Sequence, residues 1–397
     1  QTIFFVGFFL SLNEEQSISV SAVRGRLEQS LQDDNNGLIQ GCCIMWLSGR
    51  GLAAADLSIN LLLITPLVQM HQWSTWALCE LLPFSRHGNA CFVTMLAATM
   101  EVLIMLAQHL LESRCKSVES RSALALWYRV YIYVLAVCNA GHAWGVTVLS
   151  ELYAGSDLQA ALLVVASGAC ALWCLSCGRN ILGNPFNVEA DNQQTFCGQT
   201  MFGTEVEYSA KRLLDAIFTV AVIYSGVAYL WYGIWTVYDR VVFPDNPPLA
   251  MATCLCMGYL GTAAFLHMQE HASHLSRNLE ERSARQMVFF EDVFLLSATA
   301  FSVMLCKGLW MFYEELIQWY PVYAGQKDVS LWAYHFTAFA VLAGCQCSGS
   351  LLTRGVERDG TYTGGQGVKF TTTFLGCIWP EPVEENSKDK EQKDKVD

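Results

Sequence analysis

The chain has 397 residues, of which 53% are hydrophobic and only 15% are charged, and its formal net charge is -12 at pH 7. Soluble domains usually carry about 25% charged residues, so these charges are too few to cover a soluble surface of this size. The composition therefore predicts an integral membrane protein in contact with a lipid bilayer, and the acidic balance without a block of Lys and Arg excludes a nucleic-acid partner.

The two ends of the chain differ from its middle. Residues 1–50 are expected to form an N-terminal cytoplasmic or partly disordered segment that lacks its natural start, because the first residue is Gln1. Its apolar run at 2–12 is only about half as long as a membrane span. Residues 353–397 end in the mixed-charge run EENSKDKEQKDKVD, which is typical of a disordered tail.

Eight apolar segments lie between these ends, each long enough to cross about 30 Å of hydrocarbon as a helix. They run at 52–76, 89–110, 125–150, 158–177, 213–236, 248–267, 290–313 and 330–351. The connections after the second, fourth and sixth segments are longer and richer in Lys and Arg, which places them in the cytoplasm. The sequence thus predicts an all-α membrane domain over residues 51–352, with eight transmembrane helices and both termini cytoplasmic.

An acid-ended aromatic element recurs at the end of every odd-numbered segment. The acids are Glu80, Glu151, Asp239 and Glu314. Four residues earlier stand Trp76, Thr147, Trp235 and Trp310; six earlier stand Ser74, Gly145, Gly233 and Gly308; seven earlier stand Trp73, Trp144, Tyr232 and Lys307. A repeat of this kind predicts a bundle of four repeated helical hairpins.

On a helix, the acid, the position four earlier and the position seven earlier form one stripe, while the small residue six earlier lets another backbone approach. A carboxylate at a helix C-terminus opposes the macrodipole, so a Trp indole, a Lys or a backbone N–H of a neighbouring hairpin should compensate it. We favour the interpretation that the stripes clamp hairpin to hairpin. The alternative is a ring of four carboxylates that collects cations.

Glu101 lies near the middle of the second segment, where an acid usually faces a cavity or a partner. Lys307 is one candidate partner for it, and a lone His such as His142 or His335 is interpreted as a hydrogen-bonded core residue. Cys79 and Cys91 flank a short loop and could pair, and juxtamembrane cysteines could be palmitoylated. No catalytic residue, metal site or cofactor is expected.

Two of the copies, YGIWTVYD at 232–239 and KGLWMFYE at 307–314, resemble the basic-Gly-x-Trp-x-x-x-acid element of the Fuseless family of animal eight-pass membrane proteins. The likeness covers about residues 50 to 352. The basic position is Tyr232 in one copy and Trp in two others, and Thr147 replaces Trp in the second copy.

The resemblance implies a presynaptic plasma-membrane protein that helps to place voltage-gated calcium channels, with calcium-channel or active-zone proteins as partners. On this basis we expect a non-enzymatic scaffold or accessory factor in synaptic transmission. The alternative is a transporter or channel with a path lined by intramembrane charges. One observation speaks against that alternative: Pro66 is the only proline well inside a segment, whereas discontinuous transporter helices come in matched pairs.

Overall fold

A computed structural model describes residues 49–118, 120–188, 190–191, 200–203, 209–319, 327–352, 356–370 and 374. The regular structure of these residues is helical and includes no β-strand, in agreement with the predicted all-α class. The predicted N-terminal segment and most of the predicted tail lie outside the described residues.

Each of the eight apolar segments contains a helical rod, although the rods in the fourth and eighth segments end at Cys174 and Gly344, before the segments do. In chain order the rods are α4 (Gly49–Ile59), η1 (Asn60–Ile64) and α5 (Thr65–Glu80); α6 (Arg86–Leu106) and α7 (Gln108–Lys116); α8 (Arg121–Ala154); α9 (Leu158–Cys174); α10 (Ala210–Phe218), η3 (Thr219–Tyr224) and α11 (Ser225–Val241); α12 (Pro247–Glu280); α13 (Ala284–Trp319); and α14 (Lys327–Gly344). Short 3-10 turns follow at η2 (Gly178–Ile181), η4 (Ser348–Leu351) and η5 (Gln366–Val368).

Five helices among the described residues are long and apolar enough to cross a membrane. They are Arg86–Leu106, Ser122–Ala154, Ala210–Val241, Pro247–Glu280 and Ala284–Gln318. The apolar helix Leu158–Cys174 is shorter. These helices fit a multi-pass membrane protein, whereas the full count of eight spans, the repeats and the cytoplasmic termini stay predictions.

The short connections after α5, α8 and α11 all end in a helix cap. Ser85 Oγ accepts a hydrogen bond from the N–H of Gly88 (3.1 Å), Asp157 Oδ1 from Ala160 (2.8 Å), and Asn246 Oδ1 from Leu249 (3.2 Å). An N-cap side chain satisfies a backbone donor that the first helical turn leaves without a partner. These caps fix where α6, α9 and α12 begin.

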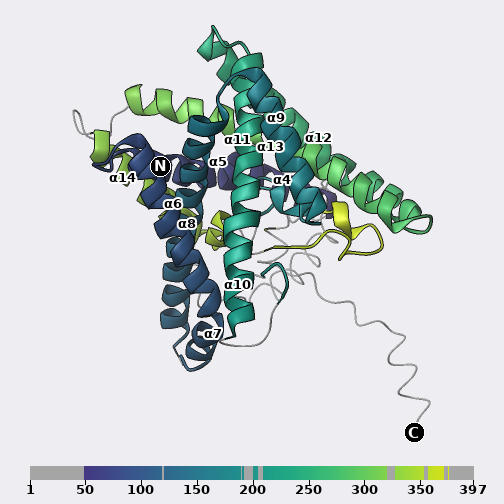
Figure 1. Cartoon of the computed structure of the whole chain (residues 1–397), viewed down its shortest axis with the longest axis horizontal. Coiled ribbons are helices and arrows are strands. Elements are labelled where there is room, and N and C mark those ends of the chain that lie inside the picture. Colours follow the sequence, from purple (N-terminus) through teal and green to yellow (C-terminus); the bar gives the residue numbers. More distant parts are fainter. Residues whose placement is uncertain are drawn as a thin grey trace, which may run out of the picture.

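The most extensive helix packing does not follow the short connections. It joins α6 to α8, α9 to α11, α12 to α13, and α14 back to α5 (Figure 1). The small residues of the repeat explain three of these pairs. A Cβ on Gly145 would lie 2.9 Å from the carbonyl oxygen of Ala90, and one on Gly308 would lie 2.8 Å from the backbone nitrogen of Leu255, so the backbones approach as the sequence predicts.

Four helices, α5, α8, α11 and α13, contact one another in a closed cycle, and α6, α9, α12 and α14 pack outside them. Figure 1 shows α10, η3 and α11 as one rod near the centre, with α6 and α8 on one side and α12 and α13 on the other. The inner cycle brings the repeat elements of all four copies to one end of a common interior.

Two of the inner rods carry a π-helical turn at the same place. η1 precedes α5 and η3 precedes α11, and each begins twenty residues before the repeat acid, Glu80 or Asp239. Pro66 follows η1 and cannot supply the N–H of a regular turn, while no proline accompanies η3. Pro66 thus has no proline counterpart in α10–α11, as the sequence shows, but the π-helical turn beside it has a counterpart in η3, because a helix can widen without a proline.

Candidate functional site

A cavity of about 320 Å³ lies inside the cycle of α5, α8, α11 and α13. Its lining includes the carboxyl of Glu101 from α6 and the amides of Gln69, Gln72 and Asn139. At the far end from the repeat elements it reaches the loops that follow α9 and α14, where Asn184 and other polar residues line it. The volume is in the range of small-molecule pockets.

The residues four positions before the repeat acids all line this cavity: Trp76, Thr147, Trp235 and Trp310. The ring centroids of Trp76 and Trp310 are 4.6 Å apart and those of Trp235 and Trp310 are 5.2 Å apart, both in edge-to-face geometry. The indole N–H of Trp310 donates to Gln69 Oε1 at 2.9 Å. Three indoles from three inner helices thus close one end of the cavity.

The residues seven positions before the acids are buried and link each inner helix to the one before it in the cycle. Lys307 on α13 forms an ion pair with Asp239 on α11, and Tyr232 on α11 donates through its hydroxyl to the carbonyl oxygen of Gly155 (2.8 Å), just after α8. Trp144 on α8 packs in a cluster with Trp76 on α5, and the Trp73 and Tyr313 rings are 5.8 Å apart. These contacts join neighbouring inner helices.

The repeat acids themselves are not among the residues that line the cavity. Glu80, Asp239 and Glu314 are exposed and Glu151 is half-buried. Glu151 forms an ion pair with Arg86 (2.6 Å), which lies in the neighbouring connection, and Asp239 pairs with Lys307. Glu151 and Asp239 are thus each paired with a base of the chain, as the clamp interpretation expects.

Glu101 takes a partner that the sequence analysis did not assign to it. Its Oε2 lies 2.7 Å from Nδ1 of His142, and Nε2 of His142 lies 3.0 Å from Ser225 Oγ. Lys307, which the sequence offered as one candidate partner, pairs with Asp239 instead. A charge inside a membrane is costly without compensation, so His142 and Ser225 make the position of Glu101 tenable. The three residues connect α6, α8 and α11.

A second polar cluster lies between α5, α8 and α14. Nδ1 of His335 is 3.2 Å from the hydroxyl of Thr75, and its Nε2 is 3.0 Å from the hydroxyl of Tyr133. The ring of His71 lies 4.2 Å from that of His335, and neither nitrogen of His71 has a hydrogen-bond partner among the described residues. His142 and His335 are hydrogen-bonded core residues, as interpreted from the sequence.

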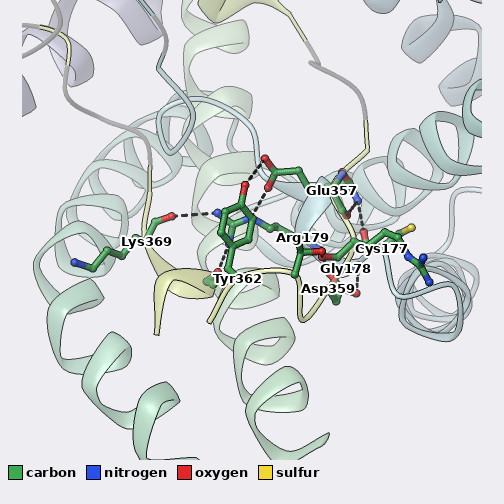
Figure 2. Close-up of polar contacts among 11 residues, drawn as sticks. Cys177, Gly178, Arg179, Glu357, Asp359, Tyr362 and Lys369 are labelled. Carbon is green, nitrogen blue, oxygen red and sulfur yellow. Dashed lines mark hydrogen bonds and ion pairs between the residues drawn. The ribbon is translucent and has the colours of Figure 1, made fainter. Parts of the chain in front are cut away.

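The loops after α9 and α14 cover the other end of the cavity and bind each other reciprocally. Asp359 accepts hydrogen bonds from the backbone N–H groups of Gly178 (2.7 Å) and Arg179 (2.9 Å) (Figure 2). Asp191, from the first loop, accepts from the N–H of Gly349 (2.7 Å) and the hydroxyl of Ser348 (2.7 Å) in the second. We call this pair of contacts the aspartate clasp.

The guanidinium of Arg179 organises the side chains around the clasp. It pairs with Glu357 (2.6 Å), donates to the carbonyl oxygen of Gly367 and lies 4.5 Å from the ring centroid of Tyr362 (Figure 2). Burial raises the pKa of Asp359 above its usual range, against the opposing effect of its N–H donors. Burial, together with Glu357, also raises the pKa of Tyr362.

The described residues thus define a multi-pass helical membrane protein with a polar cavity among its inner helices. Residues 51–352 match the Fuseless family, which is most of the chain, so this protein belongs to that family. The comparison with curated proteins and the comparison with solved structures gave no match.

Several residues at these sites were missed by sequence reasoning. Ser225, Asp191 and Asp359 are single polar residues without a spacing pattern that would connect them to their partners. One signal was present: the turns at Cys177-Gly178 and Cys347-Ser348 both follow an apolar segment and share a Cys at the same place. Cys79 and Cys91, which the sequence left open to pairing, are both free thiols.

Proposed function

We propose that this chain is a non-enzymatic multi-pass protein of the plasma membrane that acts at presynaptic terminals as a scaffold or accessory factor in synaptic transmission. Its partners would be calcium-channel or active-zone proteins, and its role would be to help place voltage-gated calcium channels. The observation that supports this proposal is membership of the Fuseless family over residues 51–352.

The connection between α12 and α13 is the surface of this protein that we propose for partner binding. Arg282 and Arg285 are exposed there, and the predicted orientation makes this connection cytoplasmic. Charges at the edge of an interface steer the partner toward it. Reversing the charges of Arg282 and Arg285 should therefore weaken partner binding more than reversing two exposed charges elsewhere on the protein.

The test is a co-purification from gently solubilised neuronal membranes with a C-terminal tag, read by mass spectrometry. Calcium-channel subunits or active-zone proteins should be enriched over a membrane-protein control. The double variant Arg282→Glu with Arg285→Glu should reduce that enrichment. The control is the double variant Arg114→Glu with Lys211→Glu, which reverses two exposed charges elsewhere and should leave the enrichment unchanged. If well-folded protein brings down no such partner, the presynaptic accessory role is wrong.

The second candidate is a transporter or channel, and the cavity between the inner helices specifically favours it. The matched π-turns in α4–α5 and α10–α11 also favour it, because π-helical turns are frequent at functional sites. Glu101→Gln should then abolish flux into proteoliposomes while the protein still reaches the surface. An accessory factor should keep its partners after this change and lose only some stability.

A further inference from the structure

The cavity contains the chemistry of a particular ligand class, and that chemistry depends on neither proposed function. Its closed end is made of the Trp76, Trp235 and Trp310 rings, each supplied by a different helix. Indole faces carry negative electrostatic potential and attract cations within about 6 Å of the ring centroid. Several indoles around one space form the kind of aromatic cage that binds ammonium groups.

An ammonium group of the protein already uses one of these rings. Nζ of Lys307 lies 4.8 Å from the ring centroid of Trp235, and the side chain of Lys307 is only 6% exposed. Lys307 is not in the lining and is also paired with Asp239, so this contact shows only that the Trp235 ring accepts an ammonium in this part of the bundle. Trp310 is held in place by its hydrogen bond to Gln69, so the orientation of the cage is fixed before a ligand enters.

A carboxyl group lines the same cavity deeper in the helix bundle. Glu101 is 1% exposed, and its hydrogen bond to His142 directs Oε2 within the interior rather than toward lipid. A buried carboxyl opposes entry of an anion and favours a cation. The amides of Gln69 and Asn139 belong to the same lining and make it polar.

The basic residues that line the opposite end do not offset this preference. Arg179 is paired with Glu357 and donates to the carbonyl of Gly367, and Lys369 is paired with Glu270 (3.4 Å). Each of these charges is therefore balanced by an acid of the chain. The acid in the interior and the indoles at the end are therefore the lining groups that favour a cation.

We propose that the cavity enclosed by α5, α8, α11 and α13 binds a small organic cation that carries an ammonium group. The indoles of Trp76, Trp235 and Trp310 hold the ammonium, and Glu101 provides the complementary charge along the cavity. The volume of about 320 Å³ matches a small molecule.

The test is equilibrium binding to the full chain, purified into lipid nanodiscs, with choline as the cation and 3,3-dimethylbutan-1-ol as its uncharged isostere. The two molecules have nearly the same shape, so a difference in affinity reports charge. Choline should bind saturably and raise the unfolding temperature, whereas the isostere should do neither. If choline does not bind, or the isostere binds equally well, the proposal is wrong.

Variants locate the site. Trp310→Leu and Trp76→Leu should each weaken choline binding by about tenfold, the magnitude expected for loss of a desolvated cation–aromatic contact. Trp173→Leu is the matched control, because Trp173 is half exposed on the outer helix α9 and does not line the cavity. If Trp173→Leu weakens binding as much as the cavity variants, the cage is not the site.

Glu101→Gln should weaken the binding of choline without changing the response to the isostere. If this variant does not fold, the tryptophan variants alone test the cation site. Flux measured separately in proteoliposomes distinguishes the hypotheses. Saturable binding without flux would keep the cation site and remove the transporter candidate, whereas flux of another solute without choline binding would overturn the cation site alone.

Discussion

The ion pair between Lys307 and Asp239 tests the clamp interpretation, because removing one member of the pair should destabilise the protein more than removing the other. Removing one member of a buried pair costs about 3–5 kcal/mol, because the other charge is left uncompensated. The side chain of Lys307 is 6% exposed but that of Asp239 is 48% exposed. Asp239→Asn therefore leaves a buried ammonium, whereas Lys307→Met leaves a carboxylate that water can solvate.

We expect Asp239→Asn to lower the free energy of unfolding by about 2 kcal/mol, less than the full buried-pair cost, because Asp239 is half solvated and Lys307 keeps its contact with Trp235. Lys307→Met should cost about 0–1 kcal/mol, the range of exposed pairs. The double variant should resemble Lys307→Met. An SDS unfolding titration of the detergent-solubilised protein, followed by circular dichroism, measures all three. Equal costs for the two single variants, or additivity in the double variant, would refute the reasoning.

Three further predictions concern packing, the clasp and a buried histidine. Gly308→Ala should destabilise the protein by about 1–3 kcal/mol in the same titration, because its Cβ would meet the α12 backbone, while Gly344→Ala, which meets nothing within 4 Å, should be neutral. Asp359→Ala should open the aspartate clasp and let N-ethylmaleimide label the buried Cys177, read by peptide mass spectrometry; unchanged labelling would contradict the role of the clasp. His71→Phe should be neutral or stabilising by about 1–2 kcal/mol, because neither ring nitrogen has a partner among the described residues, and a clear loss of stability would indicate a partner outside them.

The helices could be predicted because hydropathy and length act locally. Backbone groups in lipid need partners within the same segment, so an apolar run of about 20 residues specifies a helix whatever surrounds it. Gly145 and Gly308 also predicted close backbone approach, because a glycine in a helix leaves room for the backbone of a neighbouring helix.

Helix pairing and polar partners could not be predicted in the same way. Short connections suggest that each inner helix packs most extensively against the helix that follows it. The glycines of α8, α11 and α13 instead contact the helix that precedes each of them, α6, α9 and α12. The partner of Glu101 depends on the rotation of α8 about its axis, which hydropathy leaves open. Sequence distance gave no reason to choose His142 over Lys307, whereas three-dimensional packing decides between them.

The pairing of α5 with α14 has a consequence for biosynthesis. The rod that opens the described part of the domain finds its most extensive partner in the helix α14, Lys327–Gly344, near its other end. Translation at about 5–20 residues per second leaves roughly 10–50 seconds between the two helices. During that interval the inner face of α5 has no permanent neighbour on one side, and a chaperone or lipid must cover it. A premature stop codon anywhere before α14 would leave that face open for good, so even late truncations should be cleared by quality control.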